Sequence, residues 1–442
     1  MAASVQARVL IVARDDLVAG PLAEGLDRLG WRTVTARTAS TALASVVDLQ
    51  IEAVIIDLAD GPAMRELPQR LKAACAPRRL PVMAIGDPAP ALADYGFDLT
   101  MAAPLHPSQA AMRLEHLVRL AVAEEEFDLR VETFAARGRR LRVAEPDTSP
   151  LRILAIGEPA PQFLALSNAL KDSGAQVVGA FTAYTAFDYL HERPFDGVVL
   201  WAGDNPQEAL SIAAGLRRNT RLYHTPALLY LRQDSYITTA EAYHRGVSDV
   251  ASPEALEEDT ARRLLELARN HRRQAAVRQA LEAARGSGLM DAATGLYTRD
   301  LFAAHLARLA QASRARNRPL SVCVLRMADR PDLARPRAEG WLARAIPQIG
   351  SMIGRLVRVE DTAARLAPEV FALALPATPL AAARTAGERI AAVIGCTAFE
   401  AGEGRQPFVV EFDIGAAEVA TPEAVGHALE TAAHRAQALQ AS

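Results

Sequence analysis

The stretch VLIV at residues 9–12 is a short apolar run, followed by a polar loop and then by a helical pattern of apolar residues. The same order returns further along the chain, where ILAI occupies residues 153–156. Two more apolar runs follow in each case, AVIIDL and LPVMAIG in the first segment and GVVLW and TPALLYL in the second. Such runs in alternation with helical patterns are typical of parallel βα units. The repeat therefore predicts two α/β domains, each a parallel sheet with helices on both faces.

The rest of the chain divides into connectors and a third domain. Residues 124–150 are charged and contain RGRRLR and PDTSP, which predicts a linker. Residues 253–285 carry Leu and Ala at three- and four-residue spacing, which predicts a long amphipathic helix. Beyond it, LSVCVLRM and VFALALP predict strands, and residues 379–394 predict an Ala-rich helix. The expected order is a domain over 1–125, a linker over 126–150, a domain over 151–275, a helical linker over 276–290 and a domain over 291–442.

Composition excludes several classes of protein. The formal net charge of −3 argues against a general affinity for nucleic acid or anionic lipid. Three cysteines lie far apart in apolar surroundings, which gives neither a disulfide framework nor a zinc site. The first residues do not form a signal peptide, and charges or prolines interrupt the apolar runs elsewhere. We therefore expect a cytoplasmic protein without membrane insertion, metal or cofactor.

The order of motifs in the first two domains resembles that of response-regulator receiver domains, which have a flavodoxin-like parallel sheet. In that family an acidic pair holds Mg²⁺, and an Asp after the third strand accepts a phosphoryl group. Asp57 stands at the acceptor position of the first domain, but Ala13 and Arg14 replace the acidic pair. Asp15 and Asp16 follow two residues late and could partly substitute. The favoured interpretation is an inert carboxylate, with phosphorylation of Asp57 as the alternative.

The remaining receiver positions are also changed. In the first domain, Gly86 and Ala103 stand where the family has a Thr or Ser and a Lys that read the phosphate. In the second domain the acceptor position holds Trp201, which cannot accept phosphate. Its other positions differ too: Gly157 and Glu158 replace the acidic pair, Arg232 the Thr and Ser252 the Lys. We expect the second domain to be a scaffold for dimerisation or partner docking.

The third domain resembles the GGDEF family. DAATGLYTRDLF at residues 291–302 resembles the opening D-x-x-TGL-x-N/T-R of that family, and it follows a long helix as the family's opening does. RVEDTAARLAPEVFALALPAT at residues 358–378 resembles its RxxD-x5-GGDEF-F-x-x-x-LP-x-T stretch. The resemblance implies an α+β, nucleotidyl-cyclase-like fold. Active members are dimers that condense two GTP molecules with the help of Mg²⁺.

The positions that this resemblance assigns to catalysis are degenerate. The signature reads APEVF, so that Ala367 and Pro368 replace two glycines whose freedom lets the backbone approach the nucleotide. Val370 deletes a carboxylate, and only Glu369 survives. Arg326 stands at the metal-binding Asp of the first strand. Ala334 and Ala343 stand at the Asn and Asp that select guanine. We therefore predict that cyclase activity is absent; residual activity, or rescue by an active partner subunit, is the alternative.

The inhibitory site of the family is retained. Arg358 and Asp361 match its RxxD, which binds stacked cyclic di-GMP, and Thr362–Leu366 form the five-residue spacer. Arg389 matches a second guanine-contacting Arg of the family. An Arg fork donates to guanine O6 and N7, and a carboxylate can accept from guanine N–H groups, with about 1–3 kcal/mol per bidentate pair. The alternative is that Arg358 is a plain surface salt-bridge partner.

The spacing alone is weak evidence, because the chain contains two other matches to RxxD, at Arg193–Asp196 and Arg326–Asp329. Register against the signature distinguishes the match at Arg358–Asp361, and we interpret the other two as chance.

The layout of two receivers and a GGDEF domain resembles PleD-like response regulators. With a degenerate signature and an intact RxxD, the resemblance implies a dimeric cyclic di-GMP effector at a cell pole. It further implies recruitment of an RcdA-type protease adaptor and delivery of the cell-cycle regulator CtrA to the ClpXP protease. A scaffold that binds no nucleotide is a further alternative.

Overall fold

The computed structural model describes residues 7–438 with short gaps. The gaps are 62–63, 87–94, 102–104, 106, 142–146, 204–205, 220, 232–236, 239–240, 243–244, 252–254, 284–287 and 403. Ala103, Arg232 and Ser252, which were compared with receiver positions, therefore lie outside the described residues. The chain divides into two compact units, Met1–Leu141 with Ala284–Ser442, and Arg142–Ala283.

The first sheet is parallel and has the strand order β2-β1-β3-β4-β5, which is flavodoxin-like. Its strands are β1 (Arg8–Val12), β2 (Arg32–Ala36), β3 (Ile51–Asp57), β4 (Val82–Ile85) and β5 (Leu99–Met101). Its helices are α1 (Asp16–Arg28), α2 (Ala39–Asp48), η1 (Leu58–Asp60), α3 (Leu67–Cys75) and α4 (Pro107–Ala135). One apolar core lies under α1 and α4, and another lies under α2 and α3. The apolar runs are buried on both faces, as parallel strands require.

The second sheet repeats this order as β7-β6-β8-β9-β10. Its strands are β6 (Arg152–Ile156), β7 (Gln176–Ala180), β8 (Gly197–Ala202), β9 (Ala227–Leu231) and β10 (Asp249–Ala251). Its helices are α5 (Pro161–Asp172), α6 (Ala183–Glu192), α7 (Pro206–Arg218) and α9 (Glu257–Ala283). Helices α5 and α9 cover one core, and α6 and α7 cover the other.

The third sheet is mixed, with the order β11-β13-β14-β12-β15. Its strands are β11 (Tyr297–Thr298), β12 (Leu320–Met327), β13 (Thr362–Ala367), β14 (Val370–Pro376) and β15 (Phe412–Glu418). Its helices are α10 (Arg299–Ala315), α11 (Pro331–Ala338), α12 (Trp341–Leu356), α13 (Leu380–Gly395), η5 (Pro422–Ala424) and α14 (Val425–Ala438). Helices α10 and α14 lie on one face of the sheet, and α12 and α13 lie on the other. The predicted fold, two flavodoxin-like domains and an α+β third domain, is confirmed.

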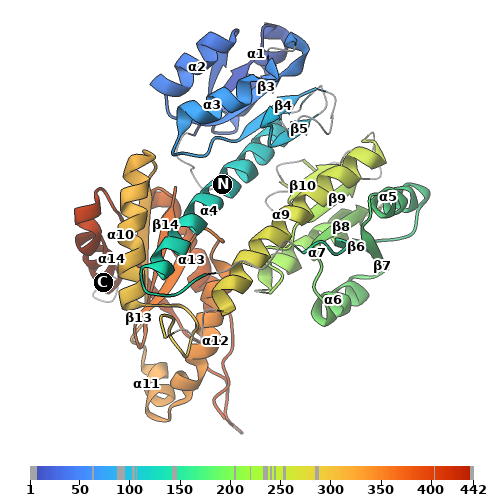
Figure 1. The fold of residues 1–442 in the computed structure, drawn as a ribbon. Coiled ribbons are helices and arrows are strands. Elements are labelled where there is room, and N and C mark those ends of the chain that lie inside the picture. Colours follow the sequence, from blue (N-terminus) through green and yellow to red (C-terminus); the bar gives the residue numbers. More distant parts are fainter. Residues whose placement is uncertain are drawn as a thin grey trace. The chain divides into compact units, whose positions relative to one another are not determined.

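Helix α4 differs from the expectation. The predicted boundary at residues 125–126 falls inside this helix, which continues to Ala135 and lies alongside α10 (Figure 1). Its first half packs Leu114 and Leu117 on the first sheet, and its second half buries Phe134 edge-on against Tyr297. The charged run suggested a linker, but several of its charges are buried in ion pairs instead of being solvated.

Two smaller expectations are tested as well. Cys75 and Cys323 are buried in their apolar surroundings, whereas Cys396 is exposed because it follows the end of α13. Within the described part of the chain, no helix has the length and apolar character needed to cross a membrane.

Candidate functional site

Arg358 and Asp361 lie in a tight turn between the end of α12 and the start of β13. The Asp361 carboxylate accepts the backbone N–H of Arg358 through Oδ2 at 3.0 Å. The backbone N–H of Asp361 donates in return to the carbonyl oxygen of Arg358 at 3.2 Å. This pair of bonds closes the turn and fixes the Asp361 carboxylate against the backbone of Arg358.

The turn places buried acidic groups beside a partly exposed arginine. Asp361 is 8% exposed, and within the described structure its Oδ1 atom has no hydrogen-bond partner. The Arg358 side chain is 36% exposed and lies 4.0 Å from the Glu360 carboxylate. Burial, together with the charge of Asp361, raises the pKa of Glu360 to about 7. Burial also raises the pKa of Asp361, against the opposing effect of Arg358.

A buried polar network on α4 supports this turn. Arg130 donates from Nη2 to the carbonyl oxygen of Asp361 at 2.9 Å, and its Nε donates to Glu126 at 2.6 Å. Glu126 also accepts from Thr362 Oγ1 at 3.2 Å, and it lies 2.8 Å from His305 Nε2. Both members of the Glu126–Arg130 pair are about 2% exposed. The backbone of Asp361 is therefore anchored by a helix that precedes it by more than two hundred residues.

Sequence reasoning missed this network. The one available signal was the spacing of Glu126 and Arg130, four residues apart, which places an ion pair on one face of a helix. That spacing is common on solvent-exposed helices, so it does not by itself indicate a buried partner.

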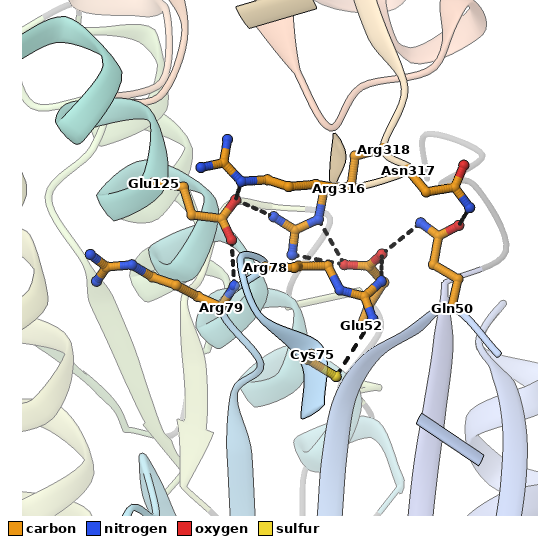
Figure 2. Close-up of polar contacts among 9 residues, drawn as sticks. All are labelled: Gln50, Glu52, Cys75, Arg78, Arg79, Glu125, Arg316, Asn317 and Arg318. Atoms are coloured by element: carbon orange, nitrogen blue, oxygen red, sulfur yellow. Dashed lines mark hydrogen bonds and ion pairs between the residues drawn. The ribbon is translucent and has the colours of Figure 1, made fainter. Parts of the chain in front are cut away.

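A second cluster fixes α4 against the third domain (Figure 2). Arg318, just before β12, donates to Glu125 on α4 at 2.6 Å and to Glu52 on β3 at 3.0 Å. Arg316 lies 3.4 Å from Glu125, and Arg78 lies 3.4 Å from Glu52. The Arg318 and Glu125 side chains are only 4% and 5% exposed. Because removing one partner would leave a buried charge, this cluster favours a single position for α4.

Arg389, the third predicted ligand contact, lies on α13. Its side chain is exposed, and α13 packs against α12, the helix that leads into Arg358. The structure thus places Arg389 on the helix next to the one that carries the turn.

The degenerate signature forms the hairpin between β13 and β14. Ala367 ends β13 and Val370 begins β14, so Pro368 and Glu369 form the turn. Glu369 receives a fork from Arg337 on α11, with Nη2 at 2.8 Å and Nε at 3.1 Å. The hydrogen bonds that Arg337 donates to Glu369 and Asp329 raise the pKa of Arg337. The surviving signature carboxylate is therefore neutralised from within the chain.

Other positions compared with the catalytic site carry no metal-binding group. Arg326 lies on β12, where it pairs with Val370 on the neighbouring strand β14 and with Asp413 on the neighbouring strand β15. Ala334 and Ala343 are exposed on α11 and α12, and a methyl group cannot hydrogen-bond a guanine. Among the described residues, no group of three His, Cys, Asp or Glu side chains could hold a metal ion.

The other two RxxD matches have internal structural partners. Asp196 accepts from Arg272 and from the backbone of Arg152 at 2.8 Å, and Arg193 lies over the ring of Tyr189. Asp329 pairs with Arg337 as described above.

The receiver-like phosphorylation site is poorly equipped. Asp57 ends β3, is 8% exposed and accepts the backbone N–H of Ala59 at 3.0 Å. Asp15 caps α1 by accepting from Leu17 at 2.8 Å, while Asp16 pairs with Arg37. Both candidate substitutes for the acidic pair thus have other partners.

Close packing explains the glycine at another receiver position of this domain. A Cβ on Gly86 would lie 3.1 Å from Leu58 Cβ, which disfavours the Thr or Ser of active receivers.

In the second domain, an aromatic cluster occupies the position that corresponds to Asp57 of the first domain. Trp201 is buried, stacks on Tyr230 at 4.9 Å between ring centroids and meets Phe163 edge-on at 5.6 Å. A Cβ at Gly157 would lie 2.6 Å from Trp201 Cβ, so the glycine and the tryptophan fit each other. The acceptor position has become part of the hydrophobic core.

Comparisons with known proteins concern single domains. Residues 288–441 match the family described as "Diguanylate cyclase, GGDEF domain", so this part of the chain is a GGDEF domain. No curated protein matches the chain.

The solved structures that are similar to parts of this chain include GGDEF domains and a response regulator. The GGDEF domain of FimX from Pseudomonas aeruginosa has 21% identity, a TM-score of 0.30, and coverage of 34% of this chain and 94% of that one. The GGDEF domain of DgcB from Caulobacter crescentus, in complex with c-di-GMP, has 21% identity and a TM-score of 0.32. The match covers 34% of this chain and 86% of that one. A response regulator from Thermotoga maritima has 18% identity and a TM-score of 0.25. The match covers 27% of this chain and 98% of that one.

Proposed function

We propose, from the premise that residues 288–441 are a GGDEF domain, that this chain binds cyclic di-GMP at Arg358 and Asp361 and acts as an effector without making the nucleotide. One observation carries the proposal. Among the residues that the structure describes, the buried Oδ1 atom of Asp361 has no hydrogen-bond partner, and the partly exposed guanidinium of Arg358 belongs to the same turn. A carboxylate acceptor next to a guanidinium fork is the arrangement that recognises the edge of a guanine.

Each group has a defined role in this proposal. The Arg358 fork donates to guanine O6 and N7, and Asp361 Oδ1 accepts from guanine N–H groups. Asp361 must be ionised to accept from two donors, so its raised pKa makes binding weaker as the pH falls. Arg389, on the neighbouring helix, contributes a further guanidinium to a stacked second guanine.

Loss of catalysis is the second part of the proposal. Two-metal phosphoryl transfer needs carboxylates that are free to bind Mg²⁺. Here Glu369 is paired with Arg337, while Arg326 and Val370 replace the remaining acidic positions. Residual cyclase activity is the competing function, and incubation with GTP and Mg²⁺ separates the two: accumulation of cyclic di-GMP would contradict the effector proposal.

The finer cellular role rests on resemblance alone. The combination of two altered receivers, an altered signature and an intact RxxD resembles PopA, a PleD-like effector. On that resemblance we include in the proposal a cytoplasmic homodimer at a cell pole that recruits an RcdA-type adaptor and delivers CtrA to ClpXP.

Calorimetry of the full chain with cyclic di-GMP tests the binding proposal. We expect heat of binding for the wild type and about tenfold to a hundredfold weaker binding for Arg358→Ala, from the loss of one bidentate contact. Arg193→Ala is the matched control, because it removes an arginine from a chance RxxD match in the other unit. An absence of heat for the wild type would favour the nucleotide-free scaffold, and equal affinity for wild type and Arg358→Ala would place the ligand elsewhere.

A further inference from the structure

The second unit carries a cluster of arginines where helix α7 ends. Arg217 holds three backbone segments together there. Its Nε donates to the carbonyl oxygen of Gly246 at 2.9 Å, and its Nη1 donates to the carbonyl oxygens of Tyr223 and, at 2.9 Å, Thr225. These contacts bring one arginine from each segment, or two, to the same end of the sheet. The arginine cluster consists of Arg217, Arg218, Arg221 and Arg245.

Most of this positive charge is not balanced from within the chain. Arg218 and Arg221 are exposed and form no ion pair within the described part of the chain. Arg217 is half-buried, and its partners among the described residues are the three carbonyl groups and the Ser248 hydroxyl at 3.4 Å. Burial lowers the pKa of Arg217 to about 10, because desolvation disfavours the charged form. Only Arg245 has a carboxylate within reach, that of Glu241 at 3.8 Å.

The first domain shows how the equivalent position is balanced. Lys72 and Arg217 each follow a buried leucine in the last turn of the helix before the fourth strand. Asp98 and Ser248 each accept the first backbone N–H of that strand, at 2.7 Å in one domain and 3.1 Å in the other. Asp98 also pairs with Lys72 at 2.8 Å, whereas Ser248 has no charge to offer Arg217. The second domain thus keeps the cation and lacks its counter-ion.

We propose that the arginine cluster binds an acidic segment of a protein partner, whose carboxylates balance Arg217 as Asp98 balances Lys72. An arginine fork donates two parallel hydrogen bonds to a carboxylate. Single exposed pairs contribute little, so binding requires several arginines together and weakens with salt. A nucleic acid is the less suitable partner, because the cluster is small and the chain has a net charge of −3.

This surface goes beyond the proposed function. It belongs to the unit that does not contain the turn at residues 358–361. The same unit has Trp201 at its phosphoacceptor position, buried in the core. A charge-based surface therefore gives this domain a way to hold a partner that needs neither phosphorylation nor nucleotide.

Charge reversal at the exposed members tests the proposal. The measurement is fluorescence anisotropy of a labelled oligoglutamate peptide with the full chain at low salt. We expect the double variant Arg218→Glu/Arg221→Glu to bind about tenfold more weakly than the wild type, since two attractive contacts become repulsive. Arg273→Glu is the matched control, because Arg273 is exposed on α9, which covers the other face of the sheet. Melting temperatures check the fold, and the single variants Arg218→Gln and Arg221→Gln replace the double variant if it melts early.

Ser248→Asp tests the role of Arg217 without removing it. The new carboxylate supplies the counter-ion that Asp98 provides in the first domain. We expect a higher melting temperature and peptide binding weaker by about threefold to tenfold, because Arg217 then has an internal partner. Ser248→Asn has nearly the same size without the charge, and we expect it to bind the peptide as the wild type does.

Each outcome decides for or against the proposal. Weaker binding in the charge-reversed and Ser248→Asp variants, with both controls unchanged, supports it. No peptide binding by the wild type, or equal binding by the wild type and the charge-reversed variant, overturns it. Unchanged affinity in a folded Ser248→Asp variant removes Arg217 from the site. A single-stranded DNA oligonucleotide that binds more tightly than the peptide, and is lost in the charge-reversed variant, also overturns it in favour of a nucleic acid.

Discussion

The two ends of strand β13 carry acidic groups in opposite situations. At its C-terminal end, Glu369 in the signature hairpin receives the full fork of Arg337. At its N-terminal end, Asp361 holds its own turn with Oδ2, while its buried Oδ1 has no hydrogen-bond partner within the described part of the chain. A carboxylate whose partner is built into the chain gains little from a ligand, whereas a buried acceptor without one costs about 1–3 kcal/mol that a ligand can recover. The difference favours ligand binding at the turn and not at the hairpin.

The largest effect is expected from removing the support of the turn. Arg130→Ala leaves Glu126 buried without its cation, so we expect a loss of about 3–5 kcal/mol in the free energy of unfolding. Urea denaturation of the full chain measures it. Arg308→Ala is the control, because its pair with Glu132 is exposed and is expected to contribute less than about 1 kcal/mol. Equal effects of the two substitutions would contradict a special role for the buried pair.

Asp361→Asn changes the acceptor while preserving its size. We expect binding of cyclic di-GMP to weaken about tenfold to a hundredfold, because the amide offers one oxygen where the ionised carboxylate offers two. Calorimetry measures the affinity, and the melting temperature without ligand should not fall, because a buried charge has been removed. The mirror substitution Glu369→Gln should leave the affinity unchanged, and a loss of affinity there would contradict the contrast between the two ends of β13.

Glu360→Gln tests the buried charge of the turn through its pH dependence. The pKa of Glu360 is raised from 4.5 to about 7, so the folded state binds the proton more tightly than the unfolded state does. Its contribution to stability is therefore complete below pH 4.5 and is lost as the pH rises through about 7. We expect the Gln variant to match the wild type near pH 5 and to exceed it by on the order of 1–2 kcal/mol at pH 8. Denaturation curves at the two pH values decide this, and a difference that does not depend on pH would refute it.

The smallest effect is expected at the hairpin. Arg337→Ala releases Glu369, but the pair is about 30% exposed, so we expect a loss of about 1 kcal/mol or less. No cyclase activity should appear with GTP and Mg²⁺, because Arg326, Pro368 and Val370 remain. Arg330→Ala, which removes an exposed pair with Glu411, is the matched control. Production of cyclic di-GMP by Arg337→Ala would show that this arginine alone blocks catalysis.

Local patterns in the sequence predicted most of the fold. The apolar runs gave the strands of both parallel sheets, because buried parallel strands are apolar on both faces. Register against the signature distinguishes Arg358 and Asp361 from the two other RxxD matches, and their role in binding stays a prediction. In those other matches, Asp196 pairs with Arg272 and Asp329 pairs with Arg337. The role of α4 could not be predicted, because Arg130 and Asp361 are far apart in sequence and a charged run looks the same in a linker as in a buried network. The aromatic cluster around Trp201 was missed for the same reason, since its members come from different strands and helices.

The continuity of α4 limits how this chain can be divided. A cut at the predicted boundary, after residue 125, would separate Leu114 and Leu117 on the first sheet from Arg130 and Phe134 beside the third domain. Each fragment would expose apolar surface or buried charge that the other now covers. The first and third domains, which belong to one compact unit, are therefore expected to depend on each other for folding. A chain shortened to either domain alone would lose the side of α4 that its core or its buried ion pairs need.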